Sequence, residues 1–153
     1  MYYHISSGWA KRTSKQNKEE KGMLVREGKS HGVLIYHDGN PIGWCQFGPR
    51  EELPRIDRMK NYKPIRQDVW RITCFFIDRK YRGKGVAKEA LGAALKMMAA
   101  RGVRVVEAYP IEVGQKRYSS SMLWFGSLKF FQGFGFREVG RLGKNQFIVQ
   151  KQF

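Results

Sequence analysis

The residues from 81 to 88, Tyr-Arg-Gly-Lys-Gly-Val-Ala-Lys, have the composition of an anion-binding turn. They follow an apolar, β-rich run over 72–77 and precede a strongly helical stretch. The first N–H groups of a helix lack partners within the helix, and the helix dipole adds partial positive charge there. Glycines let the backbone approach a ligand closely, and Arg82, Lys84 and Lys88 add full charges. The pattern predicts a cradle for a pyrophosphate.

The spacing within this turn excludes two common phosphate-binding motifs. A P-loop needs Gly, four residues and then Gly-Lys followed by Ser or Thr, and the sequence does not contain it. The dinucleotide pattern Gly-x-Gly-x-x-Gly fails because Lys88 stands where the last glycine belongs. Arg-x-x-Gly-x-Ala does match, with Arg82, Gly85 and Ala87. An ordinary strand–helix connection with solubilising charges is the alternative for these residues.

The composition predicts one domain over residues 1–153. The chain is 42% hydrophobic and 14% aromatic, which suffices for one hydrophobic core. It contains no apolar run long enough to span a membrane, and its N-terminus lacks the basic-then-apolar layout of a signal peptide. Cys45 and Cys74 lie in apolar runs, so we expect free buried thiols in a reducing cytoplasm. No histidine stands at ligand spacing from them, so we expect no bound metal. Because no apolar run is long enough to span a membrane, we also expect no membrane partner.

The charge of the chain is strongly positive. Lys and Arg number 29 against 13 Asp and Glu, giving a formal net charge of +16. Such a balance favours polyanionic partners such as nucleic acid, an anionic membrane surface or a phosphorylated ligand. The basic residues are scattered, and no block of like charges occurs. We therefore expect a diffuse basic surface, which keeps nucleic acid open as a partner.

Two hairpins are predicted, one in each half of the chain. β-rich runs over 32–36 and 42–47 flank an Asp-Gly turn. Runs over 136–141 and 146–151 flank Gly-Lys-Asn. These four segments should form antiparallel strands.

Between the hairpins, the pattern predicts a parallel strand–helix–strand unit. The strands over 69–77 and 103–109 are nearly continuous in apolar content, hence buried on both faces. A helix over 86–101 connects them, with Gly102 placed to end it. A short crossover of this kind makes its two strands parallel.

Other helices are predicted less regularly. Residues 9–30 have the composition of polar helices that pack shallowly, with breaks at Gly22 and Gly28. A short helix is expected around 55–60 within a proline-punctuated loop, and a second apolar helix over 122–132.

These elements, in this order, resemble the GNAT superfamily of N-acetyltransferases, whose acetyl-CoA-binding motif is similar to the Arg-x-x-Gly-x-Ala match. Near the end, Phe131-x-x-x-Gly135-Phe136 is similar to the family's Tyr-x-x-x-Gly-Phe. The resemblance covers roughly residues 32–150, and residues 1–30 match least. Three segments resemble one bacterial branch: Gly-Trp-Cys-Gln-Phe-Gly-Pro-Arg over 43–50, Trp-Arg-Ile-Thr-Cys-Phe-Phe over 70–76 and Val-Glu-Ala-Tyr-Pro over 106–110.

The resemblance implies a fold of the α/β (α+β) class, with a central mixed sheet flanked by helices. The sheet should be mostly antiparallel, with a splayed parallel pair. The implied reaction is direct acetyl transfer from acetyl-CoA, a cosubstrate, to an amine acceptor in a ternary complex. Main-chain N–H groups of the turn would hold the pyrophosphate, and the edge of strand 69–77 would pair with the pantetheine arm. The residues expected to bind acetyl-CoA are Phe75, Phe76, Ile77, Arg82, Gly83, Lys84, Gly85, Val86, Ala87 and Lys88.

Glu107 and Tyr109 are the candidate catalytic residues. In the family, the Tyr of Tyr-x-x-x-Gly-Phe often protonates the leaving thiolate, but Phe131 occupies that position here and cannot donate a proton. Tyr109 could substitute, as could Tyr118 or a water. Glu107 is the first candidate base, because a carboxylate in apolar surroundings accepts a proton more readily than one in water. The alternative is a structural carboxylate, paired with Arg71, Arg101 or Arg104.

The acceptor side of the site is less defined by the sequence. Glu51 and Glu52 lie on the loop expected to face the acceptor amine, and aromatic residues such as Trp70 could line its pocket. No role is assigned to His4 or to the other two histidines.

Several functions remain open on the sequence alone. The leading one is acetylation of a small-molecule or peptidyl amine. A nucleic-acid-associated acetyltransferase, acting on tRNA or the ribosome, or an RNA-binding module on the same scaffold, is the second. A non-catalytic acyl-CoA-binding domain is the third, suggested by Phe131. The resemblance also implies a homodimer formed through the C-terminal strands.

Overall fold

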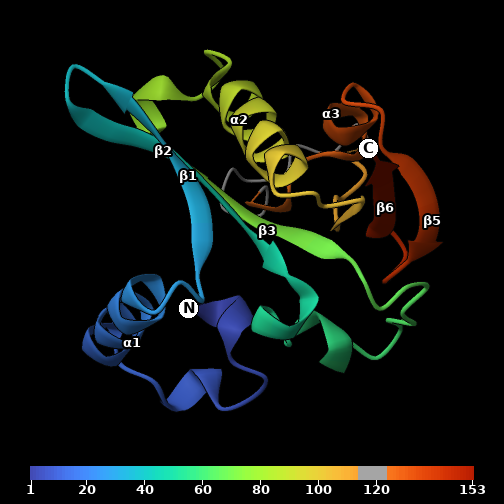
Figure 1. Ribbon diagram of the computed structural model, residues 1–153, viewed down its shortest axis with the longest axis horizontal. Helices are drawn as coiled ribbons and strands as arrows, with labels where there is room; N and C mark the ends of the chain where they lie inside the picture. The colour runs from blue at the N-terminus through green and yellow to red at the C-terminus, as the bar shows by residue number, and fades with distance from the viewer. Residues whose placement is uncertain (114–123) are drawn as a thin grey trace.

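A six-stranded mixed sheet forms the centre of the structure, a computed structural model that describes residues 1–113 and 124–153 (Figure 1). Every neighbouring pair of strands is antiparallel except β3 and β4, which are parallel, as the sequence predicts. The order across the sheet is β1-β2-β3-β4-β6-β5. In chain order the strands are β1 (His31–His37), β2 (Asn40–Pro49), β3 (Trp70–Ile77), β4 (Val105–Ala108), β5 (Arg137–Arg141) and β6 (Phe147–Gln152).

Both predicted hairpins are confirmed. β1 and β2 pair from His31↔Phe47 to His37↔Asn40, which leaves Asp38 and Gly39 as the turn. Their φ values, 48° and 75°, are both positive, as a type I′ turn requires. Aspartate tolerates this region better than most residues, and glycine enters it freely. β5 and β6 form the second hairpin at the far edge of the sheet.

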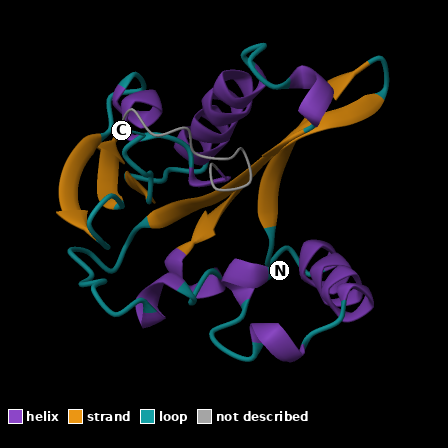
Figure 2. Cartoon of the chain, turned by 180° about the vertical axis from the view of Figure 1, so that it is seen from behind, coloured by secondary structure: helices purple, strands orange, loops and turns teal. Residues whose placement is uncertain are grey.

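In the described ranges, three α-helices flank the sheet: α1 (Ser14–Arg26), α2 (Val86–Ala100) and α3 (Leu128–Gln132). Figures 1 and 2 show α1 and α2 on opposite sides of the sheet. None of these described helices has the length and apolar content needed to cross a membrane. Single 3₁₀ turns lie at Tyr2–His4, Trp9–Lys11, Arg50–Glu52, Ile56–Arg58 and Arg79–Tyr81.

The predicted helix breaks are partly wrong. α1 runs through Gly22, because a capping box between Thr13 and Gln16 stabilises its N-terminus and one interior glycine costs only about 1 kcal/mol. The chain does leave the helix at Gly28, whose φ is 69°. α1 buries no residue fully, as its polar composition predicts. The apolar helix expected over 122–132 begins only at Leu128, after its cap Ser127, and positions 122 and 123 lie outside the described residues.

The parallel β3–α2–β4 unit is confirmed, with one difference in burial. α2 spans the predicted range, and Gly102 follows it with a φ of 74°. β4 is buried throughout, whereas β3 is buried from Arg71 to Thr73 and again at Phe75. Phe76, near its end, is 58% exposed. Burial on both faces fails there because β4 no longer accompanies β3.

Close approach of α2 to the sheet depends on Gly43 in β2. A Cβ at this position would lie 2.6 Å from Cγ1 of Val86 and 3.2 Å from Cδ1 of Ile77. Val86 is the first residue of α2 and is buried. A glycine in the strand therefore sets how closely the N-terminus of α2 sits on the sheet.

We expect Gly43→Ala to lower the free energy of unfolding by about 1–3 kcal/mol, because the added methyl group must displace the start of α2. Urea unfolding followed by circular dichroism measures the change. Gly143→Ala is the control, since a Cβ there meets nothing within 4 Å and its φ is not positive. Equal stability of the two variants would show that α2 shifts without cost.

Candidate functional site

The parallel strands β3 and β4 separate partway along β3. They pair only at Trp70↔Val106, Arg71↔Glu107 and Ile72↔Ala108. β3 then continues to Ile77, so that no strand in the described chain pairs with this last part of β3 on the β4 side. The separation of the parallel strands that the resemblance to the GNAT superfamily implies is therefore present. Phe75, Phe76 and Ile77, three of the predicted cofactor residues, lie on the separated part.

A β-bulge lies where the separation begins. Phe47 of β2 pairs with Ile72, and the next β2 residue, Gln46, pairs with Cys74. Thr73 is thus an extra residue in β3. A bulge bends its strand and increases the local twist, which helps to turn the end of β3 away from β4.

The glycine-rich turn lies directly after this separated end. Gly83 and Gly85 have φ values of 76° and 84°, and Gly85 is the N-cap of α2. Arg82 folds back, so that its Nε donates to the carbonyl of Ile77 at 3.0 Å. This bond joins the turn to the end of β3. The ten predicted cofactor residues therefore lie together along the end of β3, the turn and the start of α2.

The turn has the geometry that an anion requires. Within the part of the chain that the structure describes, no carbonyl or side chain accepts a hydrogen bond from the N–H groups of Gly83, Lys84 or Gly85. A Cβ at either glycine would project into open space. The side chains of Arg82, Lys84 and Lys88 are exposed. Free donors, open space and positive charge fit the pyrophosphate of acetyl-CoA.

Glu107 is fully buried and accepts three hydrogen bonds. Its Oε1 accepts from the Tyr109 hydroxyl at 2.6 Å and from the Tyr62 hydroxyl at 2.9 Å. Its Oε2 accepts from the Gln150 side-chain amide at 2.8 Å. None of the arginines considered in the sequence analysis pairs with it directly; Arg71 reaches it only through Tyr62. Tyr62 and Gln150 were not foreseen, because nothing in their local sequence indicates a carboxylate partner.

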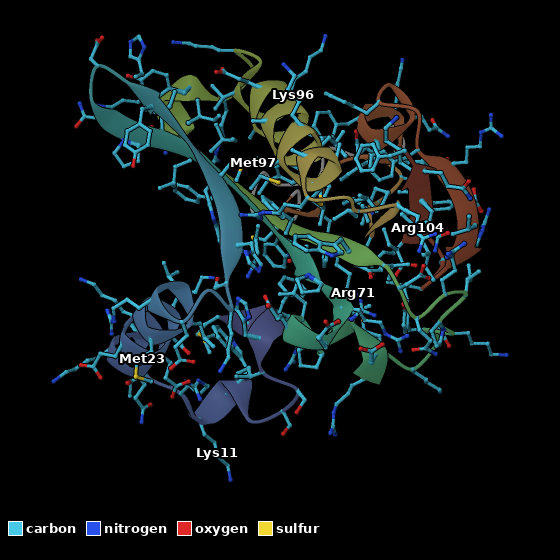
Figure 3. The ribbon with its side chains drawn as sticks, in the orientation of Figure 1. Lys11, Met23, Arg71, Lys96, Met97 and Arg104 are labelled. Atoms are coloured by element: carbon cyan, nitrogen blue, oxygen red, sulfur yellow. The ribbon has the colours of Figure 1, made fainter. Side chains whose placement is uncertain are left out.

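Arg71, the neighbour of Glu107 across the strand pair, is also fully buried. It forms two 2.9 Å bonds to the carboxylate of Asp57 and donates to the carbonyl of Leu53 at 2.9 Å. Figure 3 shows Arg71 between β3 and the segment that follows β2. The arginine therefore fastens that segment to the sheet beside the point where the strands separate.

The two residues considered for the proton-donor role have different surroundings. Tyr109 is 1% exposed, and burial raises its pKa well above the usual range. Phe131 is fully buried among aromatic rings, including Phe75 at 6.1 Å and Phe136 at 5.0 Å between ring centroids. Tyr118 lies outside the described residues. The catalytic roles of Glu107 and Tyr109 stay predictions.

His4, which was given no role, connects the N-terminal segment to the bulge. Its Nδ1 donates to the carbonyl of Glu52 at 2.9 Å, so its Nε2 is the acceptor. Nε2 accepts from Gln46 at 2.7 Å and from Lys21 at 2.9 Å. Gln46 in turn accepts from the Thr73 hydroxyl at 3.3 Å. Burial lowers the pKa of His4 to about 4 and that of Lys21 to about 8.

The loop expected to face the acceptor lies partly elsewhere. Glu51 and Trp70 line a cavity of about 250 Å³ with Gly102 and Arg104, at the closed end of the β3–β4 pair. Glu52 turns toward His31, 3.3 Å away. Neither carboxylate faces the separated strands, because β2 runs on to Pro49 and carries the loop to the other end of β3.

The ion pair of Asp57 gives a pH-dependent contribution to stability. Burial alone would raise the pKa of Asp57, but hydrogen bonds from Arg71 and Arg50 outweigh it and lower the pKa. Stability from a lowered carboxyl pKa is present above the unfolded pKa, about 3.9, and is lost as the pH falls through the folded value. We expect Asp57→Asn to cost about 3 kcal/mol at pH 7, since Arg71 loses its counter-charge.

Urea unfolding at several pH values tests this expectation, and the difference from the native protein should shrink below about pH 4. Asp68→Asn is the matched control, because it removes the exposed ion pair with Arg66 and should leave the unfolding midpoint nearly unchanged. A pH-independent loss for Asp57→Asn would contradict the ion-pair explanation.

Comparison with known proteins bears on the whole arrangement. Three solved structures share the fold: PaiA N-acetyltransferase from Thermoplasma acidophilum in complex with coenzyme A, ribosomal-protein-alanine N-acetyltransferase from Brucella melitensis, and an acetyltransferase from Bacillus cereus. The first is 16% identical over 92% of this chain and 72% of that one, with a TM-score of 0.60. The second is 17% identical over 93% and 80%, with a TM-score of 0.60. The third is 14% identical over the full length of both chains, with a TM-score of 0.54.

A family model described as the acetyltransferase (GNAT) family matches residues 2–120. That range contains the separated strands, the bulge and the glycine-rich turn. The match extends over most of the chain, including the N-terminal residues, where the sequence motifs resemble the family least. The chain belongs to the acetyltransferase (GNAT) family.

Proposed function

We propose that this protein transfers the acetyl group of acetyl-CoA to an amine acceptor by direct attack in a ternary complex. The observation that carries the proposal is the separated end of β3 leading straight into a turn with free N–H donors. An extended edge and an anion cradle, joined by the Arg82–Ile77 hydrogen bond, match the two polar parts of coenzyme A.

The roles of the cofactor residues follow from their positions. The N–H groups of Gly83 to Ala87 hold the pyrophosphate, since that of Lys88 already donates to the carbonyl of Gly85 at 2.9 Å. The side chains of Arg82, Lys84 and Lys88 add charge. The main chain of Phe75, Phe76 and Ile77 pairs with the pantetheine arm, as an added strand would. Val86 and Ala87 contribute the first N–H groups of α2, and Val86 fixes the contact of the helix with the sheet.

Acetyl-CoA supplies the acetyl group as a thioester with a good leaving group. The chain must present the acceptor nitrogen to the carbonyl carbon, and a main-chain N–H at the end of β3 would stabilise charge on the carbonyl oxygen. Loss of one such donor in other enzymes costs about a hundred- to a thousandfold in rate. As the C–N bond forms and the C–S bond breaks, the amine loses a proton and the sulfur gains one.

Glu107 and Tyr109 are our candidates for these proton transfers. Tyr109 directly follows β4, where the two strands part, and it shares a short hydrogen bond with Glu107. Their burial and full hydrogen bonding equally support a positioning role, in which the pair holds the end of β4 in place. The two roles make different demands on the hydroxyl of Tyr109 and can be separated by substitution.

We expect the native protein to bind acetyl-CoA with micromolar affinity and Gly85→Glu to abolish binding, because the new carboxylate would occupy the pyrophosphate position. Isothermal titration calorimetry measures both. Gly102→Ala is the matched control for backbone strain: its φ of 74° is similar, its Cβ also meets open space, and it lies at the opposite end of α2. It should bind normally. Absence of binding by the native protein would overturn the proposed function.

We expect Tyr109→Phe to lower kcat by about 100-fold or more if Tyr109 is the acid, because general acid help is worth about 10²–10⁴. Tyr62→Phe is the matched control, since it removes the other hydroxyl bonded to the same oxygen of Glu107. Release of free coenzyme A, followed with a thiol reagent, measures the rate. Equal and small losses of kcat in both variants would assign Glu107 and Tyr109 to positioning. In that case Glu107→Gln should lower the unfolding temperature while kcat changes little.

A further inference from the structure

A small pocket lies on the side of the sheet opposite α2, between the N-terminal residues and the segment after β2. Figures 1 and 2 show these two parts of the chain side by side. The pocket has a volume of about 150 Å³, and its lining consists of Tyr2, Tyr3, Arg55, Arg58, Met59 and Phe125. A cavity of about this volume accommodates a benzene ring.

The walls of the pocket are aromatic. The rings of Tyr2 and Tyr3 meet edge to face with centroids 5.0 Å apart, and Tyr3 meets Phe125 in the same way at 6.2 Å. Met59 adds a flexible apolar surface. Such walls favour a flat apolar group over a strongly hydrated one.

The charge in the pocket is entirely positive. The guanidinium of Arg55 lies 3.9 Å from the ring centroid of Tyr2, and Arg58 is exposed. Among the described residues no carboxylate pairs with either arginine, and none lines the pocket. Two guanidinium groups without counter-charges fit a carboxylate or phosphate, which they can bind with paired hydrogen bonds.

The hydroxyl of Tyr3 lies behind the aromatic wall. Tyr3 is 4% exposed, and its hydroxyl oxygen has almost no accessible surface; the side chain of Trp124 is the polar group that approaches it. The two guanidinium groups are therefore the hydrogen-bond donors that the pocket offers to a ligand.

The pocket adjoins the separated strands. Tyr3 and Phe125 pack in the same hydrophobic cluster as Cys74, which follows the bulge residue Thr73 in β3. Burial raises the pKa of Cys74 to about 11, so it is a neutral thiol rather than a nucleophile. The aromatic wall thus ends beside the part of β3 where the acetyl group would be presented.

We propose that this pocket binds the acceptor, and that the acceptor is an amine on a ring-sized apolar body that also carries a carboxylate or phosphate. This inference rests on the proposed function. The arginines bind the anionic group, and the aromatic walls bind the apolar body. The positive surroundings also favour the neutral form of the amine, which is the form that attacks a carbonyl.

Calorimetry with three related amines tests the inference: L-phenylalanine, which has a carboxylate, tyramine phosphate, which has a phosphate, and phenethylamine, which has neither. We expect at least one anionic amine to bind about tenfold or more tightly than phenethylamine. Which of the two does so identifies the anionic group. No binding, or equal binding of all three, would overturn the inference.

Variants locate the preference in the pocket. Arg55→Gln combined with Arg58→Gln should remove it. Arg137→Gln combined with Lys144→Gln, an equal loss of charge at exposed positions of the second hairpin, is the matched control and should retain it. A preference that survives the double arginine substitution, or that the control also loses, would overturn the inference.

Acetyl-CoA titrations separate this inference from the proposed function. Binding of acetyl-CoA and acetylation of phenethylamine without any anionic preference would overturn the inference and leave the proposed function standing. Selective anion binding in a protein that does not bind acetyl-CoA would overturn the proposed function, and with it the assignment of the pocket to an acceptor.

Discussion

The structure on the side of the sheet opposite α2 is built around one buried positive charge. Arg71 has no exposure to solvent, and a guanidinium in that position is tolerated only if oxygen atoms surround it. Asp57, the carbonyl of Leu53 and the hydroxyl of Tyr62 supply those oxygens. All three belong to the long segment between β2 and β3, which contains little regular structure of its own. Satisfying Arg71 therefore folds this segment onto the sheet and places Arg55 and Met59 where they line the pocket.

The need for hydrogen-bond partners also applies to the buried carboxylate on the neighbouring strand. Glu107 stands opposite Arg71 in the strand pair, and Tyr62 bonds to both. Beyond the next pair of residues the strands separate. The last paired part of β3 and β4 is thus held by a polar network under a loop, and the separated part is free of such ties. A strand pair that is firmly closed at one end can remain open at the other without unravelling.

The sequence predicts well the parts of this fold that depend on local chemistry. The Asp-Gly turn, the apolar run of β3, the glycines before α2 and Gly102 after it each act through neighbouring residues. The contacts that the sequence did not predict connect residues far apart in the sequence. Glu107 meets Tyr62 and Gln150 across 45 and 43 residues of sequence, and His4 meets Gln46 across 42. No local pattern encodes such a partner. The bulge at Thr73 is likewise set by the register of two strands, and the pocket by three segments that have no sequence pattern in common.

The contact between Gly43 and Val86 links two parts of the molecule that are otherwise described separately. The proposed anion cradle begins at the N-terminus of α2, yet its height above the sheet is set by a glycine in the β1–β2 hairpin. Binding of a ligand at the turn would therefore be coupled to formation of that hairpin. By linkage, the ligand then stabilises the hairpin by the same free energy with which it prefers the intact contact. The edge hairpin, far from any reacting atom, thereby becomes part of the binding equilibrium, and amide exchange in β1 and β2 would slow as the cradle fills.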